Sequence, residues 1–255
     1  MVIDGNAFLV TGGSSGLGAS VGRSLLKRGA KVAFADIDLK GAEAEAADTP
    51  DRAVAVQVDV TDGSSVEQAV VAVARRFGPL RGVVNCAGIA PAQRIVGRER
   101  PHSLELFTKV VTVNLIGTFN VMRIAAAAMA GNELDAHGER GVIINTASAA
   151  AFDGQIGQAA YAASKGGVVS LTLPAARELA RNAIRVVTIA PGIFETPMLL
   201  AMSAEVQKAL GDGVPFPQRL GRPAEFAALV EHIAGNVYLN GEVIRLDGAL
   251  RMAPR

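Results

Sequence analysis

Short apolar runs alternate along this sequence with longer segments in which apolar residues recur every three or four positions. The short runs predict buried strands, and the recurring spacing between them predicts helices. The seven expected strands are Ala7–Thr11, Lys31–Ala35, Ala53–Val58, Gly82–Asn85, Val142–Thr146, Ile184–Ile189 and Glu242–Leu246. The expected helices lie near residues 17–29, 39–47, 64–77, 103–130, 157–181 and 223–234.

This alternation is typical of repeated βα units, in which the strands form a parallel sheet. We therefore expect an α/β fold, namely a doubly wound, Rossmann-type sheet of about seven parallel strands with helices on both faces. No change of composition and no internal repeat marks a second domain, so residues 1–255 are expected to form a single domain. Ligands bind such sheets beyond the carboxyl ends of the strands, where the strand order reverses.

Two segments interrupt the alternation. Residues 91–101 form an Arg-rich insertion after the fourth expected strand, and residues 195–217 follow the sixth with apolar residues mixed with Pro and Gly. Loops at the carboxyl ends of strands commonly bind or cover a substrate. A substrate loop and a lid are therefore favoured over plain surface connections.

A glycine-rich turn follows the first strand and opens the first helix. Gly12, Gly16 and Gly18 are spaced Gly-x-x-x-Gly-x-Gly. Glycine lets the backbone come close to a pyrophosphate, and a helix N-terminus supplies free N–H donors and the positive end of a dipole. The turn alone does not distinguish a phosphate site from a tight turn, but its place between strand and helix favours the phosphate site.

Acidic and small residues end the next strands. Asp36 lies twenty residues beyond Gly16, where a carboxylate accepts a hydrogen bond from an adenosine ribose and repels a 2′-phosphate. This predicts NAD rather than NADP as the cofactor. Asp59, at the end of the third strand, is a candidate for the adenine amino group. Small residues at 86–88, after Asn85, leave space for a flat cofactor, with Cys86 as a buried filler rather than a nucleophile.

The candidate catalytic groups are Tyr161 and Lys165, four residues apart on one helical face. A phenol with a pKa near 10 is a poor base at neutral pH, but an adjacent ammonium and the positive ring of NAD⁺ both favour the phenolate. Lowering the pKa by ~3 units takes ~4 kcal/mol, which two cations in a dry cleft can supply. Ser148, just past the fifth strand, is expected to hold the substrate oxygen.

The composition of the chain limits the classes of partner that it is expected to bind. Lys and Arg number 25 against 24 Asp and Glu, so the chain has no strong field for nucleic acid or an anionic membrane. Cys86 is the single cysteine, which excludes intrachain disulfides and favours a reducing, cytoplasmic location. We see no signal peptide and no apolar run near the ~18 residues of a membrane helix. The three histidines lack metal-ligand spacing, so no metal is expected.

These motifs together resemble the short-chain dehydrogenase/reductase family over nearly the full length. The match comprises the Gly turn, Asn85-Cys86-Ala87-Gly88, Asn114, Ser148, Tyr161-x-x-x-Lys165 and Pro191-Gly192. The resemblance implies an Asn-Ser-Tyr-Lys tetrad in which Asn114 helps to hold a water and Lys165 in a proton relay. From spacing alone, Asn114 is merely an amide in a helix.

A closer resemblance is to the type II 3-hydroxyacyl-CoA dehydrogenases, also called type 10 17β-hydroxysteroid dehydrogenases. It is carried by the stretches 141–148, 154–161, 190–197, 215–221 and 239–248. That group uses NAD and has an insertion after the fourth strand, and the resemblance also implies a homotetramer. It implies that Gln155 borders the substrate and that the cofactor is contacted by Gly12, Ser15, Gly16, Leu17, Gly18, Asp36, Asp59, Val60, Asn85, Cys86, Ala87, Gly88, Tyr161, Lys165, Pro191, Gly192, Phe194 and Thr196.

The leading hypothesis is NAD-dependent, reversible oxidation of a 3-hydroxyacyl-CoA to the 3-oxoacyl-CoA, with Tyr161 as general base and acid. Arg94, Arg98 and Arg100 in the insertion either bind coenzyme A phosphates or only solvate the loop. One alternative is a hydroxysteroid or other secondary-alcohol dehydrogenase. Another is a 3-oxoacyl-carrier-protein reductase, against which Asp36 argues because such enzymes usually prefer NADPH. A cofactor-binding regulator without turnover is disfavoured by the complete tetrad.

Overall fold

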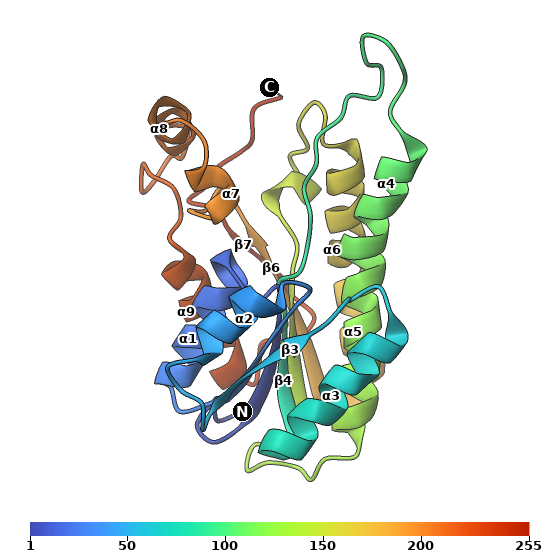
Figure 1. Cartoon of the computed structure of the whole chain (residues 1–255), viewed down its shortest axis with the longest axis vertical. Helices are drawn as coiled ribbons and strands as arrows, with labels where there is room; N and C mark the ends of the chain where they lie inside the picture. Colours follow the sequence, from blue (N-terminus) through green and yellow to red (C-terminus); the bar gives the residue numbers. More distant parts are fainter. Residues whose placement is uncertain (255) are drawn as a thin grey trace.

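All seven expected strands are present in the computed structural model, which describes residues 1–254, and all of them pair in parallel (Figure 1). Their order in the sheet is β3-β2-β1-β4-β5-β6-β7. The fold class predicted from the sequence is thereby confirmed. The strands are β1 (Ala7–Thr11), β2 (Lys31–Asp36), β3 (Ala53–Gln57), β4 (Leu80–Asn85), β5 (Gly141–Thr146), β6 (Ile184–Pro191) and β7 (Val243–Leu246).

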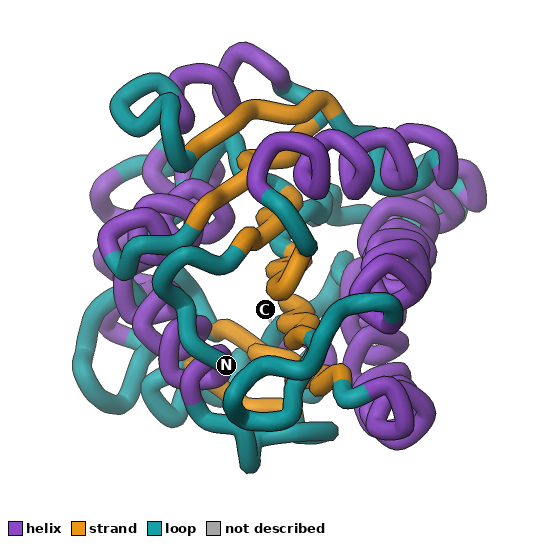
Figure 2. The backbone as a smooth tube through the Cα atoms, turned by 90° about the horizontal axis from the view of Figure 1, so that it is seen from below, coloured by secondary structure: helices purple, strands orange, loops and turns teal. Residues whose placement is uncertain are grey.

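Helices cover both faces of the sheet, as Figure 2 shows in a view turned by 90°. Strands buried on both faces read as continuous apolar runs, and every residue of β1, β5 and β6 is buried. Their side chains alternate between two cores. Phe8 and Val10 pack with α1 (Gly16–Lys27), α2 (Leu39–Ala46) and α9 (Pro223–Gly235). Leu9 packs with α3 (Gly63–Phe77), α5 (Gly117–Ala130) and α6 (Ala159–Leu179).

The main helices match the expected positions to within two residues at each end. Asp38, Asp62, Ser103 and Ser203 cap the first turns of α2, α3, α4 and α8 by accepting backbone N–H bonds. The helices are α1 (Gly16–Lys27), α2 (Leu39–Ala46), α3 (Gly63–Phe77), α4 (Leu104–Val111), α5 (Gly117–Ala130), α6 (Ala159–Leu179), α7 (Pro197–Leu200), α8 (Ala204–Asp212) and α9 (Pro223–Gly235).

The expected helix 103–130 is continuous but contains a π-helical turn, Thr112–Ile116, between α4 and α5. A π turn is rare, and hydrophobic spacing does not reveal it; such turns frequently lie at functional sites. By length and composition, the whole span Leu104–Ala130 is apolar enough to cross a membrane. Here it packs against α3, α6 and the sheet, as the core helix of a globular protein does.

The strand order reverses between β1 and β4, which are neighbours in the sheet although the chain runs from β1 to β2. In register, Thr11 is the partner of Asn85 at the carboxyl ends of these strands. Helices diverge to opposite faces at such a point, and the crevice between them is the usual ligand site of doubly wound sheets. The two interrupting segments also lie at this end (Figure 1).

The insertion at residues 91–101 forms no helix. It is mostly exposed, and one antiparallel bridge joins Val96 to Pro101. Residues 195–217 contain the helices α7 and α8. The roles of the insertion and the lid in substrate binding stay predictions.

Candidate active site

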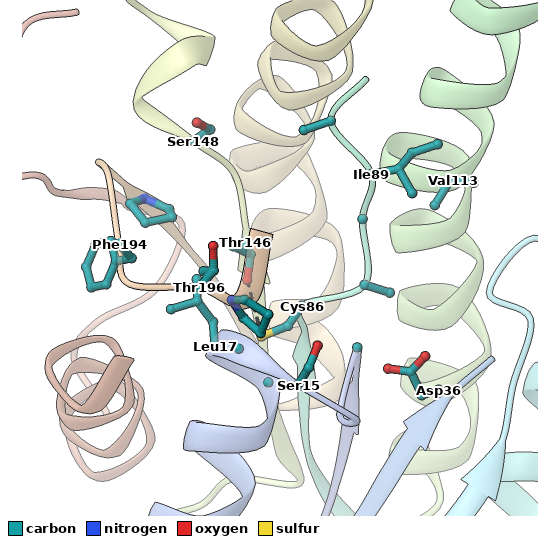
Figure 3. Close-up of a pocket in the computed structure, with 18 of the residues that line it drawn as sticks. Ser15, Leu17, Asp36, Cys86, Ile89, Val113, Thr146, Ser148, Phe194 and Thr196 are labelled. Atoms are coloured by element: carbon teal, nitrogen blue, oxygen red, sulfur yellow. Dashed lines mark hydrogen bonds between the residues drawn. The ribbon is translucent and has the colours of Figure 1, made fainter. Parts of the chain in front are cut away.

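A cavity of about 660 Å³ lies at the carboxyl ends of the strands. Its volume is within the usual range of ~300–1,000 Å³ for small-molecule sites. Figure 3 shows Asp36 and Ser148 toward opposite ends of it. Most of the predicted site residues line it, namely Gly12, Ser15, Gly16, Leu17, Gly18, Asp36, Asp59, Val60, Cys86, Ala87, Gly88, Ser148, Tyr161, Lys165, Pro191, Gly192, Phe194 and Thr196.

The glycine-rich turn leaves no room for a side chain at Gly12 or at Gly18. A Cβ on Gly12 would lie 2.8 Å from the Ala87 nitrogen, and one on Gly18 would lie 2.1 Å from the Gly12 carbonyl oxygen. Gly12 also has a φ of 64°, in the left-handed region that favours glycine. The twelve-residue helix α1 begins here with no acidic residue in its first turn. The turn therefore fits the pyrophosphate of a dinucleotide.

The carboxylate of Asp36 is fixed at the end of β2. Its Oδ2 accepts a hydrogen bond from the Ser14 backbone nitrogen at 3.0 Å, and its Oδ1 accepts one from the Asp38 nitrogen at 3.0 Å. Ser14 belongs to the glycine-rich turn, so the acidic group and the phosphate site are held relative to each other. This arrangement provides an oriented hydrogen-bond acceptor for a ribose.

The ends of β3 and β4 supply the remaining walls of the cofactor side. The Asp59 carboxylate accepts from the Thr61 nitrogen at 2.9 Å and from its hydroxyl at 2.7 Å. Asn85 does not line the cavity; its amide donates to Asn145 Oδ1 at 2.9 Å and joins β4 to β5. Its predicted contact with the cofactor stays a prediction.

The thiol of Cys86 is an inert part of the wall. Burial raises its pKa to about 11, although a hydrogen bond with Thr146 and the charge of Lys165 act in the opposite direction. Thiolates are the reactive form, so this group stays protonated and unreactive at neutral pH. The structure gives it the small-filler environment that the sequence suggested.

Tyr161 and Lys165 lie one turn apart near the start of α6, with Lys165 Nζ 5.9 Å from the centre of the Tyr161 ring. Lys165 is 4% exposed, and Nζ donates to the Thr146 carbonyl oxygen at 2.7 Å. This bond ties the helix to the end of β5. The predicted pair therefore converges on the cavity together with Ser148.

Burial dominates the electrostatics of this pair. It raises the pKa of Tyr161, against the effect of a hydrogen bond with Ser148, and it lowers the pKa of Lys165 to about 8. The sequence-based expectation concerned Lys165 together with the positive ring of bound NAD⁺, and the lowering of the phenol pKa by these two cations stays a prediction. Desolvation is the largest influence on the Tyr161 phenol and opposes its ionised form.

Asn114 lies in the π-helical turn, fully buried behind the cavity. Its Oδ1 accepts from the Ile89 nitrogen at 2.8 Å, and its Nδ2 donates to the Ile89 carbonyl at 2.9 Å and to Ser164 Oγ at 3.0 Å. Ser164, between the two catalytic candidates on α6, donates to the Tyr161 carbonyl at 2.8 Å. Asn114 thus joins the loop after β4 to the catalytic helix.

Ser148 caps the short 3₁₀ turn Ala149–Ala151 after β5, with its Oγ accepting from the Ala150 nitrogen at 3.1 Å. Gln155 is outside the residues that line the cavity, and its amide donates to the Ala253 carbonyl at 3.0 Å. Its contact with substrate stays a prediction. Within residues 1–254, no group of three His, Cys, Asp or Glu side chains is arranged to hold a metal ion.

Several lining residues were not foreseen. Ile89 and Ala90 continue the small-residue stretch after β4, while Val113 precedes Asn114, so neighbouring motifs could have indicated them. Others lie inside stretches that the sequence analysis names, namely Ser14 in the glycine-rich turn, Thr146 and Ala147 in 141–148, and Ile193 and Pro197 in 190–197. Nothing in the sequence singles out Ile37, Val58, Lys109 and Leu199, whose place depends on how the elements pack.

Comparison with known proteins agrees with this geometry. The model of the short chain dehydrogenase family matches residues 6–207, which include the glycine-rich turn, Asp36, Asn114, Ser148, Tyr161 and Lys165. The chain belongs to this family. The resemblance inferred from the motifs is confirmed, and this short-chain dehydrogenase is an oxidoreductase whose family implies a nicotinamide cofactor.

Individual relatives match over almost the whole chain. The sequence is 51% identical over 248 residues to 3-hydroxyacyl-CoA dehydrogenase type-2 of Drosophila melanogaster, covering 96% of this chain and 97% of the relative. It is 50% identical over 254 residues to the Homo sapiens protein of that name, covering 99% and 97%. A crystal structure of 3-hydroxyacyl-CoA dehydrogenase type-2 from Mycobacterium avium superposes with a TM-score of 0.94 at 43% identity, covering 98% and 97%.

The buried ammonium of this short-chain dehydrogenase gives a prediction about stability. Replacing Lys165 with Met removes a desolvated charge, so at pH 7 we expect the free energy of unfolding to rise by about 1–3 kcal/mol. Between pH 8 and 10.5 the wild-type unfolded chain binds more protons than the folded one, so wild-type stability rises with pH and the difference shrinks. Chemical denaturation at pH 7 and 9.5 measures both effects.

The exposed cavity residue Lys109 provides the control, since Lys109→Met removes a charge that remains hydrated. A stabilisation that is the same for both variants, or that does not shrink at pH 9.5, would contradict the assignment of a desolvation cost to Lys165.

Proposed function

We propose that this short-chain dehydrogenase catalyses the NAD-dependent, reversible oxidation of a 3-hydroxyacyl-CoA to the 3-oxoacyl-CoA. The observation that carries the proposal is the convergence of Ser148, Tyr161 and Lys165 in one cavity with the phosphate-binding turn. The substrate class is supported by the near-full-length relatives named for this activity. The exposed arginines of the insertion, Arg94, Arg98 and Arg100, support an anionic substrate.

Each residue of the site has a chemical role in this proposal. The Ser148 hydroxyl holds the substrate oxygen, and Tyr161 removes the hydroxyl proton in oxidation and returns it in reduction. When bound, NAD⁺ supplies the acceptor for the hydride that leaves the hydroxyl-bearing carbon. Lys165, with a pKa of about 8, is poised near neutral pH to exchange protons with Tyr161, and Asn114 keeps the two helices of the site in register.

The wild-type enzyme is expected to oxidise a 3-hydroxyacyl-CoA with a higher kcat/KM than a hydroxysteroid, measured with NAD⁺ under one condition. Tyr161→Phe should lower kcat by about 10²–10⁴ because the proton acceptor is lost. Binding of NAD⁺, followed by titration calorimetry, should change by less than about twofold, or roughly 0.4 kcal/mol.

Tyr238→Phe is the matched control, since the chain has only two tyrosines and Tyr238 is 97% exposed. If Tyr161→Phe turned over at a rate close to that of Tyr238→Phe, the assigned mechanism would be wrong. A preference for the steroid would instead retain the mechanism and exclude the acyl-CoA.

NAD is proposed over NADP because the Asp36 carboxylate is fixed beside the glycine-rich turn. Asp36→Asn removes the charge that repels a 2′-phosphate while retaining a hydrogen-bond acceptor. The ratio of kcat/KM with NAD⁺ to that with NADP⁺ should fall at least about tenfold, equivalent to ~1.4 kcal/mol. Asp38→Asn, two residues away and outside the cavity, should leave the ratio unchanged; equal ratios in both variants would refute the assignment.

We also propose that the protein is a homotetramer located in the cytoplasm. Ile116 and Phe119 are about half exposed on the long apolar helix, which supports burial against further copies. The single cysteine supports a reducing compartment. Light scattering at working concentration should give four times the 26.2 kDa chain mass, and a monomer would refute the assembly.

A further inference from the structure

Residues 149–158 connect two groups of the active site and are called the 149–158 loop here. The loop starts after Ser148, which caps its first turn, and it ends at Gln158, the N-cap of α6 and three residues before Tyr161. A displacement of this loop would therefore move the site of the substrate oxygen relative to the phenol. Whatever fixes the loop also fixes the substrate side of the cavity.

Arg245 of β7 makes the main polar anchor of this loop. Its Nη2 binds Asp153 Oδ2 at 2.5 Å, and Nη1 lies 3.4 Å from Oδ1 of the same carboxylate. The guanidinium carbon is also 5.1 Å from the centre of the Phe152 ring. Both side chains of the ion pair are largely buried, with 21% and 17% exposed, so solvent screens the pair less than a surface pair.

The same guanidinium holds the segment that follows β7. Its Nε donates to Asp247 Oδ2 at 2.6 Å, and Nη2 donates to the Leu250 carbonyl at 3.0 Å. Residues 247–254 then run back over the 149–158 loop, which lies beside them in Figure 1. The Gln155 amide donates to the Ala253 carbonyl, and the Ile156 nitrogen donates to the Pro254 carbonyl, both at 3.0 Å.

The opposite side of the loop contacts the insertion, because the Gln93 nitrogen donates to the Gly157 carbonyl at 2.8 Å. Phe152 and Ile156 are 48% and 50% exposed on the loop. An apolar acyl chain entering beside Ser148 would meet this surface. Arg245 itself does not line the cavity that fits the dinucleotide.

We propose that Arg245 is a positioning residue for the acyl side of the active site: it clamps the 149–158 loop to residues 247–254. The proposal deepens the proposed function, since it takes the substrate to be an acyl thioester. An arginine is required because its planar fork binds Asp153 with two nitrogens while Nε binds Asp247 and one face covers Phe152. A lysine ammonium has no such planar set of donors.

The test uses Arg245→Met, which keeps the aliphatic stem and removes the fork, and the isosteric Asp153→Asn. Either variant should raise KM for a 3-hydroxyacyl-CoA at least about fivefold, while kcat changes less than about threefold, because only substrate positioning is lost. The dissociation constant of NAD⁺ should change less than about twofold. Arg245→Lys should raise KM as well, and the double variant should be no worse than the worse single one.

Arg251→Met is the matched control. Arg251 lies in the same segment and also contacts Asp247, at 3.4 Å, and the Leu250 carbonyl, at 2.7 Å, but within residues 1–254 it makes no hydrogen bond to the 149–158 loop. The Arg251→Met variant should leave KM for the 3-hydroxyacyl-CoA unchanged. Hydrogen exchange, which needs no turnover, should become faster at the amides of residues 152–156 in Arg245→Met and not in Arg251→Met.

The proposal is overturned if KM stays at the wild-type value in both Arg245→Met and Asp153→Asn, or if KM and the dissociation constant of NAD⁺ rise together. Unchanged exchange at residues 152–156 overturns it as well. If wild-type protein fails to oxidise any acyl-CoA, the proposed function is at fault. The exchange measurement then still decides whether Arg245 fixes the loop.

Discussion

The active site depends on one buried amide. Asn114 binds both backbone groups of Ile89 and reaches Ser164 on α6, so a single side chain fixes the loop after β4 against the catalytic helix. Its bonds stabilise the site only if every donor and acceptor is paired, because an unpaired amide costs several kcal/mol in a dry interior. The π-helical turn places it there, and the Thr118 hydroxyl satisfies the Asn114 carbonyl at 2.7 Å.

Around this amide the protein keeps two ionisable groups in an environment that opposes their charge. Burial moves the pKa of Tyr161 upward from its ordinary 10.0 and that of Lys165 downward from 10.5 to about 8, so the proton affinities of the two groups move apart. The Lys165 ammonium therefore holds its proton less tightly than the phenol does, which favours proton transfer from Lys165 to a Tyr161 phenolate. The arrangement weakens the folded state at the place where function needs it, a common trade between stability and activity.

The order of strands and helices could be predicted because strands buried on both faces and amphipathic helices leave different periods in the sequence. The glycine-rich turn, Asp36 and the Tyr161–Lys165 pair could also be predicted from the sequence, since each is a local motif at a strand or helix end. The other features of the site depend on how the elements pack and could not be predicted. Asn85 lies beneath the cavity rather than in its wall, and the role of Ser164 exists only because Asn114 approaches from another helix. The pKa of Tyr161 could not be inferred either, because desolvation depends on the complete surroundings.

Residues 247–254 are attached to the loop between Ser148 and Tyr161. This attachment separates substitutions that alter the substrate side of the cavity from substitutions that alter its cofactor side. The glycine-rich turn and Asp36 come from the first βα units, whereas this attachment joins the later part of the chain to itself. Substitutions confined to residues 149–158 and 247–254 can thus change the substrate side of the cavity while the glycine-rich turn and Asp36 stay as they are. For the redesign of such enzymes, a segment distant in sequence from the catalytic residues becomes the natural place to begin.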